Sequence, residues 1–472
     1  MKLIKSCQYN LKMIRDLTII ILIFIFLSAS NLFSQVTEEW VARYNGSGYI
    51  SFKSRVIVVD SSCNVYVIVN KGDSETSLDY AIIKYNSEGE EQWVSRYNSP
   101  NNDWDEANAI AVDSYGNVYL TGESVGYETY YDYATVKYNS SGVEQWVRRY
   151  NFPGTGYDNA YAITVDNIGN VYITGRSKGS SLSYDYATIK YNNLGIEQWV
   201  ARYNSGTPLS DDRAYAIVVD NSGNVYVTGC GCISEIEYDY VTVKYNGEGV
   251  EQWISGYNGP SNFWDEANSI TIDDSGNVYV TGWSANSNTY PNSLDYATVK
   301  YNSEGIEQWV ARYDGPGNGE DRAKAIVVDN SGNVYVTGWS NGSGTYGDYA
   351  TIKYNSSGVE QWVSRYNGPG NSGDGAFAIA IDSSGNIYVT GDSYGSGTLD
   401  DYATIKYNSS GVEQWVVRYN GPGNGDDVAR GIAIDNSGNV YVTGHSDGLG
   451  TLIDYATIKY SQSTFSEPFY LY

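Results

Sequence analysis

The feature of this sequence that most limits its fold is a repeat of about 53 residues. The stretch from Asp348 to Asn371 returns from Asp401 to Asn424 with twenty-three of its twenty-four residues unchanged. A tryptophan marks each copy, with spacings of 53, 53, 53, 54, 56, 53 and 53 residues. These tryptophans are Trp40, Trp93, Trp146, Trp199, Trp253, Trp309, Trp362 and Trp415. A constant period of this length indicates an array of one supersecondary unit.

Each copy contains four short runs rich in β-branched and aromatic residues, which predict four strands, called A to D here. In one copy they span residues 323–329, 333–338, 348–354 and 359–366. The A–B and C–D turns, such as Asp329–Gly332, begin with Asp or Asn and end with Gly. This pattern is typical of a type I turn followed by a left-handed glycine. In the first copy Cys63 takes the place of this glycine.

The phase of the repeat distinguishes two architectures, a β-propeller and a β-solenoid. After the N-terminal segment the chain opens with a lone D run, 38–44, and its last copy ends after a C run, 454–460. A solenoid needs caps at its ends, whereas a ring completes its last blade with the first strand and has no open edge. We therefore predict an all-β fold: an eight-bladed β-propeller of four-stranded antiparallel blades over residues 35–460, closed 3+1 by the N-terminal strand.

The C–D turn at Gly142 also predicts a cross-strand register. Counting back from this turn places Val136 opposite Trp146, and Tyr133 opposite Arg149. The first pair would face a neighbouring blade. The second predicts a cation–π contact on the other face of the sheet.

The N-terminal residues 1–34 have the pattern of a secretory signal peptide. A basic segment precedes an apolar run of 13 residues, 17–29, which is too short to span a bilayer as a helix. Cleavage near Ser28 and Ser30 or before Gln35 would release the propeller, and an uncleaved anchor is the alternative. We expect a secreted, cell-surface or periplasmic protein without a transmembrane span in the mature chain. Residues 461–472 are expected to form a short tail.

The net charge of −26 excludes nucleic acid as a partner, because such a surface repels phosphate backbones. Cys63, Cys230 and Cys232 remain after removal of the signal, and an odd number predicts no disulfide framework. Three incidental thiols or one local bridge between Cys230 and Cys232 are the two possibilities. We expect a monomer.

The motifs AIxxDxSGNVYVTG, DYATIKYN and GxEQWVxRYNGPG resemble the bacterial and archaeal β-propeller repeat called SBBP, which is akin to NHL-type propellers. The resemblance covers about residues 37–460 and implies an exported or surface protein. The family name implies seven blades, whereas this sequence counts eight. A looser resemblance links Gly142-Val-Glu-Gln-Trp146 to the tryptophan-docking motif of eight-bladed quinoprotein dehydrogenases. Their paired adjacent cysteines have no equivalent here, since Cys230 and Cys232 are separated by a glycine.

One position varies while its neighbours stay constant: the residue after the Thr-Gly of run B. We interpret this ring as part of a ligand-binding surface, and the alternative is relaxed constraint at an exposed loop start. Its members are Glu123, Arg176, Cys230, Trp283, Trp339, Asp392 and His445, with Asn70 in the first copy.

A second ring, before the A runs, is regular and acidic. Oxygen-rich sites suit Ca²⁺, so calcium is the cation that this ring would hold. The simpler interpretation, which we favour, is that each aspartate caps the entry to strand A or bonds the neighbouring blade. The ring consists of Asp105, Asp158, Asp212, Asp265, Asp321, Asp374 and Asp427, and Phe52 takes the place in the first copy.

The sequence shows no catalytic motif: His445 is the one histidine, and no phosphate loop, zinc motif or nucleophile elbow is present. We therefore name no catalytic residue and expect a binding or scaffold module for an extracellular glycan or protein. Its binding surface would be the face formed by the variable B–C and D–A connections. The alternatives are a polysaccharide-acting hydrolase or lyase and, less favoured, a quinoprotein-like oxidoreductase.

Overall fold

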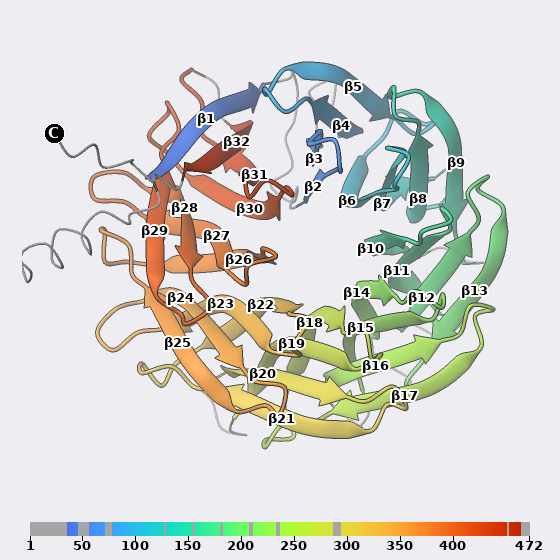
Figure 1. The fold of residues 1–472 in the computed structure, drawn as a ribbon. Helices are drawn as coiled ribbons and strands as arrows, with labels where there is room; N and C mark the ends of the chain where they lie inside the picture. The colour runs from blue at the N-terminus through green and yellow to red at the C-terminus, as the bar shows by residue number, and fades with distance from the viewer. Residues whose placement is uncertain are drawn as a thin grey trace, which may run out of the picture.

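The computed structural model describes residues 35–45, 56–70, 78–126, 129–152, 156–179, 183–206, 211–232, 237–286, 294–450 and 453–463. The signal segment 1–34, Phe52 and most of the tail lie outside these residues. Within them the chain forms eight four-stranded antiparallel sheets arranged as blades around a central channel (Figure 1). The described part of the chain contains no helix of the length and apolarity needed to cross a membrane.

Each blade runs outward from the channel in the order A, B, C, D. Blades 1 to 4 are β2 (Ile57–Val59), β3 (Val65–Ile68), β4 (Tyr80–Tyr85), β5 (Glu91–Tyr97); β6 (Asp105–Val112), β7 (Val118–Val125), β8 (Tyr131–Tyr138), β9 (Glu144–Tyr150); β10 (Asn159–Val165), β11 (Val171–Lys178), β12 (Tyr184–Tyr191), β13 (Glu197–Tyr203); and β14 (Arg213–Val219), β15 (Val225–Gly231), β16 (Asp239–Tyr245), β17 (Glu251–Tyr257).

Blades 5 to 8 follow the same order. They are β18 (Asp265–Ile272), β19 (Val278–Ala285), β20 (Leu294–Tyr301), β21 (Glu307–Tyr313); β22 (Asp321–Val328), β23 (Val334–Asn341), β24 (Gly347–Tyr354), β25 (Glu360–Tyr366); β26 (Asp374–Ile381), β27 (Ile387–Tyr394), β28 (Asp400–Tyr407), β29 (Glu413–Tyr419); and β30 (Asp427–Ile434), β31 (Val440–Ser446), β32 (Asp454–Ser463), β1 (Gln35–Tyr44).

The last blade confirms the predicted 3+1 closure, because β1 pairs with β32 and completes the sheet β1-β32-β31-β30. Strand β32 runs to Ser463, so three residues assigned to the tail belong to the propeller. They pair with Gln35, Val36 and Thr37 of β1. Arg43 of β1 then binds β32 through Asp454, with 2.9 Å between Nη2 and Oδ2.

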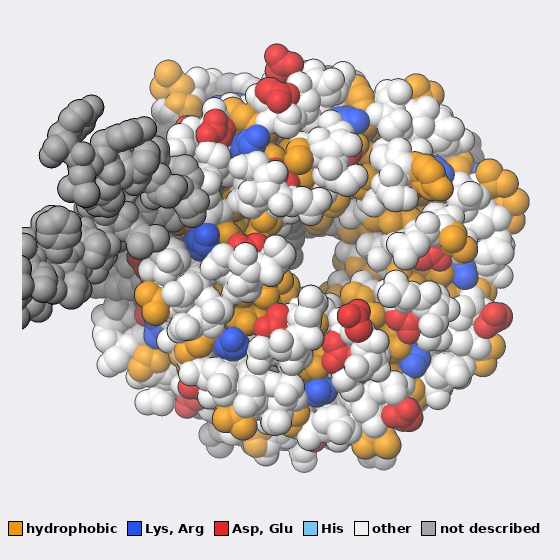
Figure 2. Space-filling view, viewed as in Figure 1, with side chains coloured by type: hydrophobic (Ala, Val, Ile, Leu, Met, Phe, Trp, Pro, Cys, Tyr) orange, Lys and Arg blue, Asp and Glu red, His pale blue; other side chains and the backbone are white. Residues whose placement is uncertain are grey.

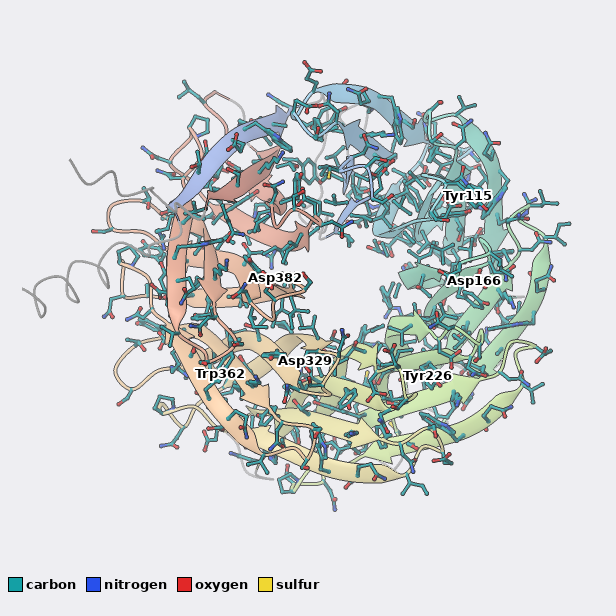
Figure 3. The ribbon with its side chains drawn as sticks, viewed as in Figure 1. Tyr115, Asp166, Tyr226, Asp329, Trp362 and Asp382 are labelled. Atoms are coloured by element: carbon teal, nitrogen blue, oxygen red, sulfur yellow. The ribbon has the colours of Figure 1, made fainter. Side chains whose placement is uncertain are left out.

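The turns have the predicted geometry. Gly332 adopts a φ of 75°, and its N–H donates to the carbonyl of Asp329. The Asp329 carboxylate accepts from the N–H groups of Ser331 and Asn333, which fixes the turn. Cys63 adopts a φ of 60° at the equivalent place, a conformation that costs a side chain more than it costs glycine. The turn residues Asp166, Asp329 and Asp382 lie on the inner side of the ring (Figure 3).

The predicted C–D register is wrong by one residue. Val136 pairs with Val147, and Tyr133 pairs with Tyr150. A register shift between Lys137 and Tyr138, next to the turn, moves the strands past each other. Tyr133 consequently packs on the Tyr150 ring at 5.5 Å between centroids, and the predicted contact with Arg149 is replaced by a Tyr–Tyr pair.

The repeated tryptophans dock each blade onto the next. Trp309 of β21 donates from Nε1 to the carbonyl of Ser356 in the following C–D turn, at 3.1 Å. A Cβ atom on Gly358 would lie 2.6 Å from the indole, so glycine is required by this contact as well as by its φ of 79°. The same contact recurs around the ring, and Trp362 lies toward the outside of it (Figure 3).

The closing blade replaces the turn carbonyl with a side chain. Blade 8 has no C–D hairpin, because its D strand comes from the N-terminus. Trp415 of blade 7 donates to Oε1 of Gln462 at 3.4 Å, and Lys406 donates to the same atom at 2.5 Å. The amide nitrogen of Gln462 donates to the carbonyl of Gly438 at 2.7 Å. Gln462 therefore supplies at the seam what the backbone supplies at the other junctions.

Candidate functional site

Within the strands, residue variation between the blades includes two positions of the inner A strands. In blades 2 to 8 the A strands follow a frame D-x-A-y-A-I in which x and y change from blade to blade, with Ser269 and Gly431 in place of the second alanine in blades 5 and 8. A bulge occurs at y in every blade from 2 to 8, for example between Ala323 and Ala325 in β22. A bulged residue leaves the hydrogen-bond ladder and its side chain is re-aimed. The y residues are Asn108, Tyr161, Tyr215, Asn268, Lys324, Phe377 and Arg430.

The variable B-strand ring lies directly beside the x residues. Glu266 pairs with Trp283, and Arg322 pairs with Trp339. The same pairing joins Glu106 with Glu123, Asn159 with Arg176, Arg213 with Cys230, Gly375 with Asp392, and Val428 with His445.

The B strands continue beyond the Thr-Gly, so the ring is not at an exposed loop start. In β19, for example, the strand runs to Ala285, two residues past Trp283. Cys230, Trp283 and His445 are buried, and Glu123, Arg176, Trp339 and Asp392 are half-buried. The alternative explanation by an exposed loop start is therefore wrong, while ligand binding by this ring stays a prediction.

Ring members bridge neighbouring blades. The Arg322 guanidinium lies 5.1 Å from the Trp283 ring centre of blade 5 and 5.7 Å from that of Trp339 in its own blade. Asn159 of blade 3 hydrogen-bonds Glu123 of blade 2, and Arg176 Nε donates to Asn159 Oδ1 at 3.0 Å. At these two junctions the x residue of one blade therefore contacts the ring residue of the blade before it.

The aspartate ring has the capping geometry that we favoured. Asp321 is buried; its Oδ2 accepts from Gly315 N–H at 2.7 Å and its Oδ1 from Asn341 N–H at 3.0 Å. It thus ties the D–A connection to the end of strand B. Equivalent pairs of bonds occur at Asp158, Asp265, Asp374 and Asp427, and one such bond occurs at Asp105 and at Asp212. Calcium binding by this ring stays a prediction.

Comparison with known proteins agrees with this architecture. The sequence profile of the SBBP family, a beta-propeller repeat, matches residues 92–127, 145–183, 198–229, 265–292, 308–344, 361–397 and 414–450, more than half of the chain. The chain belongs to the SBBP family. The profile matches seven copies, whereas the structure has eight blades, because the first copy, with Cys63 in its turn, is not matched.

Solved structures resemble this SBBP propeller only distantly. The β-propeller domain of the Trilobed protease from Pyrococcus furiosus is 8% identical, with a TM-score of 0.41 over 77% of this chain and 98% of that chain. A Bacteroides caccae protein of unknown function is 13% identical, with a TM-score of 0.34 over 61% and 90%. A calcium-binding regucalcin from Agrobacterium tumefaciens is 14% identical, with a TM-score of 0.32 over 60% and 81%. These similarities carry no argument about function, and no curated protein matches the chain.

Burial raises the pKa of several carboxyl groups in this SBBP propeller. Burial raises the pKa of Asp105, Asp212 and Asp265 to about 6. Burial, together with repulsion from Asp400, raises the pKa of Asp392 to about 7. In the A–B turns the pKa shift has the opposite sign. Burial favours a higher pKa for Asp329, but hydrogen bonds from Asn333 and nearby N–H groups outweigh burial and lower the pKa. The contribution to stability of the buried carboxyl groups with a raised pKa and that of the turn aspartates therefore change with pH in opposite directions.

We expect the melting temperature to be highest near pH 4 and to fall between about pH 4 and 7. A carboxyl group with a raised pKa holds its proton in the folded state at a pH where the unfolded chain has lost it, so its stabilising effect is lost as the pH rises through the folded pKa. Below about pH 4 the turn aspartates are protonated and their contribution is lost. Asp392→Asn is expected to flatten the decrease between about pH 4 and 7, measured by circular dichroism melts. Asp274→Asn, an exposed control, should leave the slope unchanged; equal slopes for all three proteins would contradict the assignment.

One junction brings three carboxylates together. Oxygen atoms of Asp295, Asp314 and Asp321 lie within 4.8 Å of one another. Asp314 stands where every other copy has asparagine. In blade 3 that asparagine, Asn204, donates to Asp185 Oδ1 at 2.9 Å. Asp314 instead adds a negative charge that contributes to the raised pKa of Asp295, after the larger effect of burial.

Asp314→Asn is expected to stabilise the fold at pH 7 by about 0.5 to 1.5 kcal/mol, because it replaces a repulsion by a hydrogen bond of the kind that Asn204 makes. The measurement is the melting temperature, with Glu304→Gln as an exposed control that removes the same charge. Repeating both melts with Ca²⁺ tests metal binding: an ion bound by the cluster raises the melting temperature of the wild type and not that of Asp314→Asn. A lower melting temperature for Asp314→Asn in the absence of calcium would contradict the prediction.

Proposed function

We propose that this SBBP propeller is a secreted or cell-surface binding module that recognises an extracellular glycan on the face formed by its B–C and D–A connections, called the variable face here. The opposite face carries the nearly invariant A–B and C–D turns. A rigid scaffold with one constant and one variable end is the usual arrangement for recognition by loops. The fold supplies the scaffold; the ligand class is inferred from side chains on the variable face.

The observation that carries this proposal is a pair of exposed aromatic stacks. Tyr130, in the connection from β7 to β8, stacks on Tyr157, in the connection from β9 to β10, with 5.1 Å between ring centres. The side chains are 54% and 39% exposed. Trp264, 50% exposed, stacks on Phe263 at 6.0 Å, in the connection from β17 to β18. Flat, exposed rings with a polar tip suit the apolar faces of sugar rings.

Affinity gel electrophoresis in immobilised polysaccharides tests the proposal. Xylan, a β-glucan and polygalacturonate serve as probes, and we expect at least one of them to retard the propeller. Tyr157→Ala and Trp264→Ala should each weaken that retardation about tenfold, since one stacked ring is worth about 1 kcal/mol or more. Tyr115→Ala is the matched control, because Tyr115 is 77% exposed on the opposite face.

Two results would contradict the glycan assignment. Absence of retardation by every polysaccharide would favour a protein partner on the same face. Equal retardation of Tyr115→Ala, Tyr157→Ala and Trp264→Ala would place binding elsewhere. Export is tested separately, by locating the full chain and a variant lacking residues 17–29 in cell fractions; retention of both in the cytoplasm would contradict a secreted role.

A further inference from the structure

The central channel contains a cavity whose charge differs from that of the whole chain. Figure 2 shows the channel as an opening at the centre of the ring. The cavity has a volume of about 470 Å³ and is lined mainly by A strands of blades 5 to 8 and of blade 1. Among the described residues that line it, Lys324 and Arg430 are cationic and none is acidic. The chain as a whole has a net charge of −26, so this wall is electrostatically distinct.

Three consecutive bulges build the distinct wall. Lys324, Phe377 and Arg430 are the y residues of β22, β26 and β30, where the register shifts next to Ala323, Ala376 and Ala429. All three line the cavity. Because a bulge at the same position of each strand sets their direction, they face the channel from adjacent blades at one level.

The wall combines an aromatic face with a guanidinium. The Arg430 guanidinium carbon lies 4.0 Å from the centre of the Phe377 ring, which places the cation against an apolar surface. The cavity is also lined by Ile326, Ile379 and Ile432, which supply apolar surface. A planar guanidinium in this place can donate two parallel hydrogen bonds to a carboxylate or phosphate.

Acidic and titratable groups behind the wall modify its charge. Glu266 lies close enough to Lys324, Arg213 and Arg322 that these cations oppose the rise in its pKa that burial causes. Asp392 interacts with Arg430, and its pKa of about 7 leaves it partly protonated at neutral pH. His445 also faces Arg430; burial and that charge lower its pKa to about 4, so it is neutral. Asp392 and His445 therefore only partly neutralise the positive charge of Arg430.

We propose that the channel binds an anionic ligand with a carboxylate or phosphate group on a flat, largely apolar body. Arg430 and Lys324 bind the oxyanion, and Phe377 and the isoleucines contact the body. The volume lies in the range of about 300 to 1,000 Å³ that is usual for small-molecule sites. This site is separate from the aromatic stacks of the variable face and does not depend on the glycan assignment.

Isothermal titration calorimetry with benzoate, phenyl phosphate and neutral benzyl alcohol tests the proposal. We expect benzoate or phenyl phosphate to bind at pH 7, more weakly at high salt, and benzyl alcohol not to bind. Comparing the two anions distinguishes carboxylate from phosphate recognition. Arg430→Gln and Lys324→Met should each weaken binding about tenfold or more, because a charge-assisted hydrogen bond is lost. Tyr161→Phe, at the same bulge position across the ring, is the matched control.

Melting curves establish whether each variant is folded. If Arg430→Gln does not fold, Lys324→Met still tests the site. Tyr157→Ala and Trp264→Ala should bind the anions normally, which separates this site from the proposed glycan surface. Equal binding of benzyl alcohol and benzoate would overturn the anion assignment. Unchanged affinity in folded Arg430→Gln or Lys324→Met, or no binding of either anion, would overturn the site.

Discussion

A propeller that begins at Gly46 instead of Gln35 should lose cooperative unfolding, with a loss of more than about 5 kcal/mol in the free energy of unfolding. The shortened chain lacks β1 and leaves β32 as an open edge, which favours aggregation. It also lacks Trp40, whose Nε1 donates to the Ser87 carbonyl of blade 1 at 3.1 Å. Removal of a docked indole alone typically costs about 3 to 5 kcal/mol.

The Arg43 network adds to this loss. Besides its ion pair with Asp454, the Arg43 guanidinium donates to Tyr419 Oη at 2.6 Å and to Ser446 Oγ at 2.9 Å. Without Arg43 the Asp454 carboxylate stays buried beside an open edge and loses its counter-ion. Breaking one partner of a buried pair is strongly destabilising for this reason.

Circular dichroism melts and size-exclusion chromatography of chains starting at residues 35 and 46 provide the measurement. A synthetic peptide of residues 35–45, added to the shortened chain, should restore part of the melting transition. A peptide with Trp40→Ala and Arg43→Ala is the control and should not. If the chain starting at residue 46 melted as cooperatively as the longer one, closure by β1 would not be what holds the ring together.

Trp309→Ala should destabilise the propeller by about 3 to 5 kcal/mol. The indole fills the junction between blades 5 and 6, packed at 6.2 Å from Tyr279 and 6.3 Å from Tyr354. The rigid turn at Gly358 cannot move in to fill the space, because its backbone is fixed by the hydrogen bond between Gly358 N–H and the Asn355 carbonyl. A cavity would therefore remain.

Urea unfolding followed by circular dichroism measures this loss. Trp309→Phe separates packing from hydrogen bonding: it keeps an aromatic ring, loses the bond to Ser356, and should cost less than the alanine variant. Tyr115→Ala, an exposed aromatic position, should change the stability by less than about 0.5 kcal/mol. A loss below 1 kcal/mol for Trp309→Ala would show that the junctions do not depend on the docking tryptophans.

The sequence was sufficient to predict the ring because its information is repeated. The spacing of the tryptophans predicted the blades, and the unpaired runs at 38–44 and 454–460 predicted the closure. The turn glycines predicted positive φ angles, as Gly332 confirms. The tryptophan and turn-glycine signals each occur about eight times, so chance has little effect on them.

The channel wall was not predicted, because the bulges that form it have no characteristic residue. The y positions carry Asn, Tyr, Lys, Phe and Arg, and none of these types specifies a bulge. The variation at x and y within the D-x-A-y-A-I frame, which is nearly constant in blades 2 to 8, was visible and would have indicated the wall. The variable B-strand position was found by that kind of comparison, but its burial depends on where strand B ends.

The pairing of Gln35, Val36 and Thr37 with Ser461, Gln462 and Ser463 bears on how the chain finds its correct partner during folding. Eight C strands of nearly the same sequence compete for each D strand, and seven are connected to theirs by a short hairpin. No hairpin links strand β1 to a C strand, so its sequence must select the correct C strand. The three additional pairs, which a hairpin-linked C strand has no room to form, give β32 an advantage over the other seven. The short extensions of β1 and β32 thus favour closure of the ring at the eighth blade. Their loss would permit premature closure or exchange of strands between molecules.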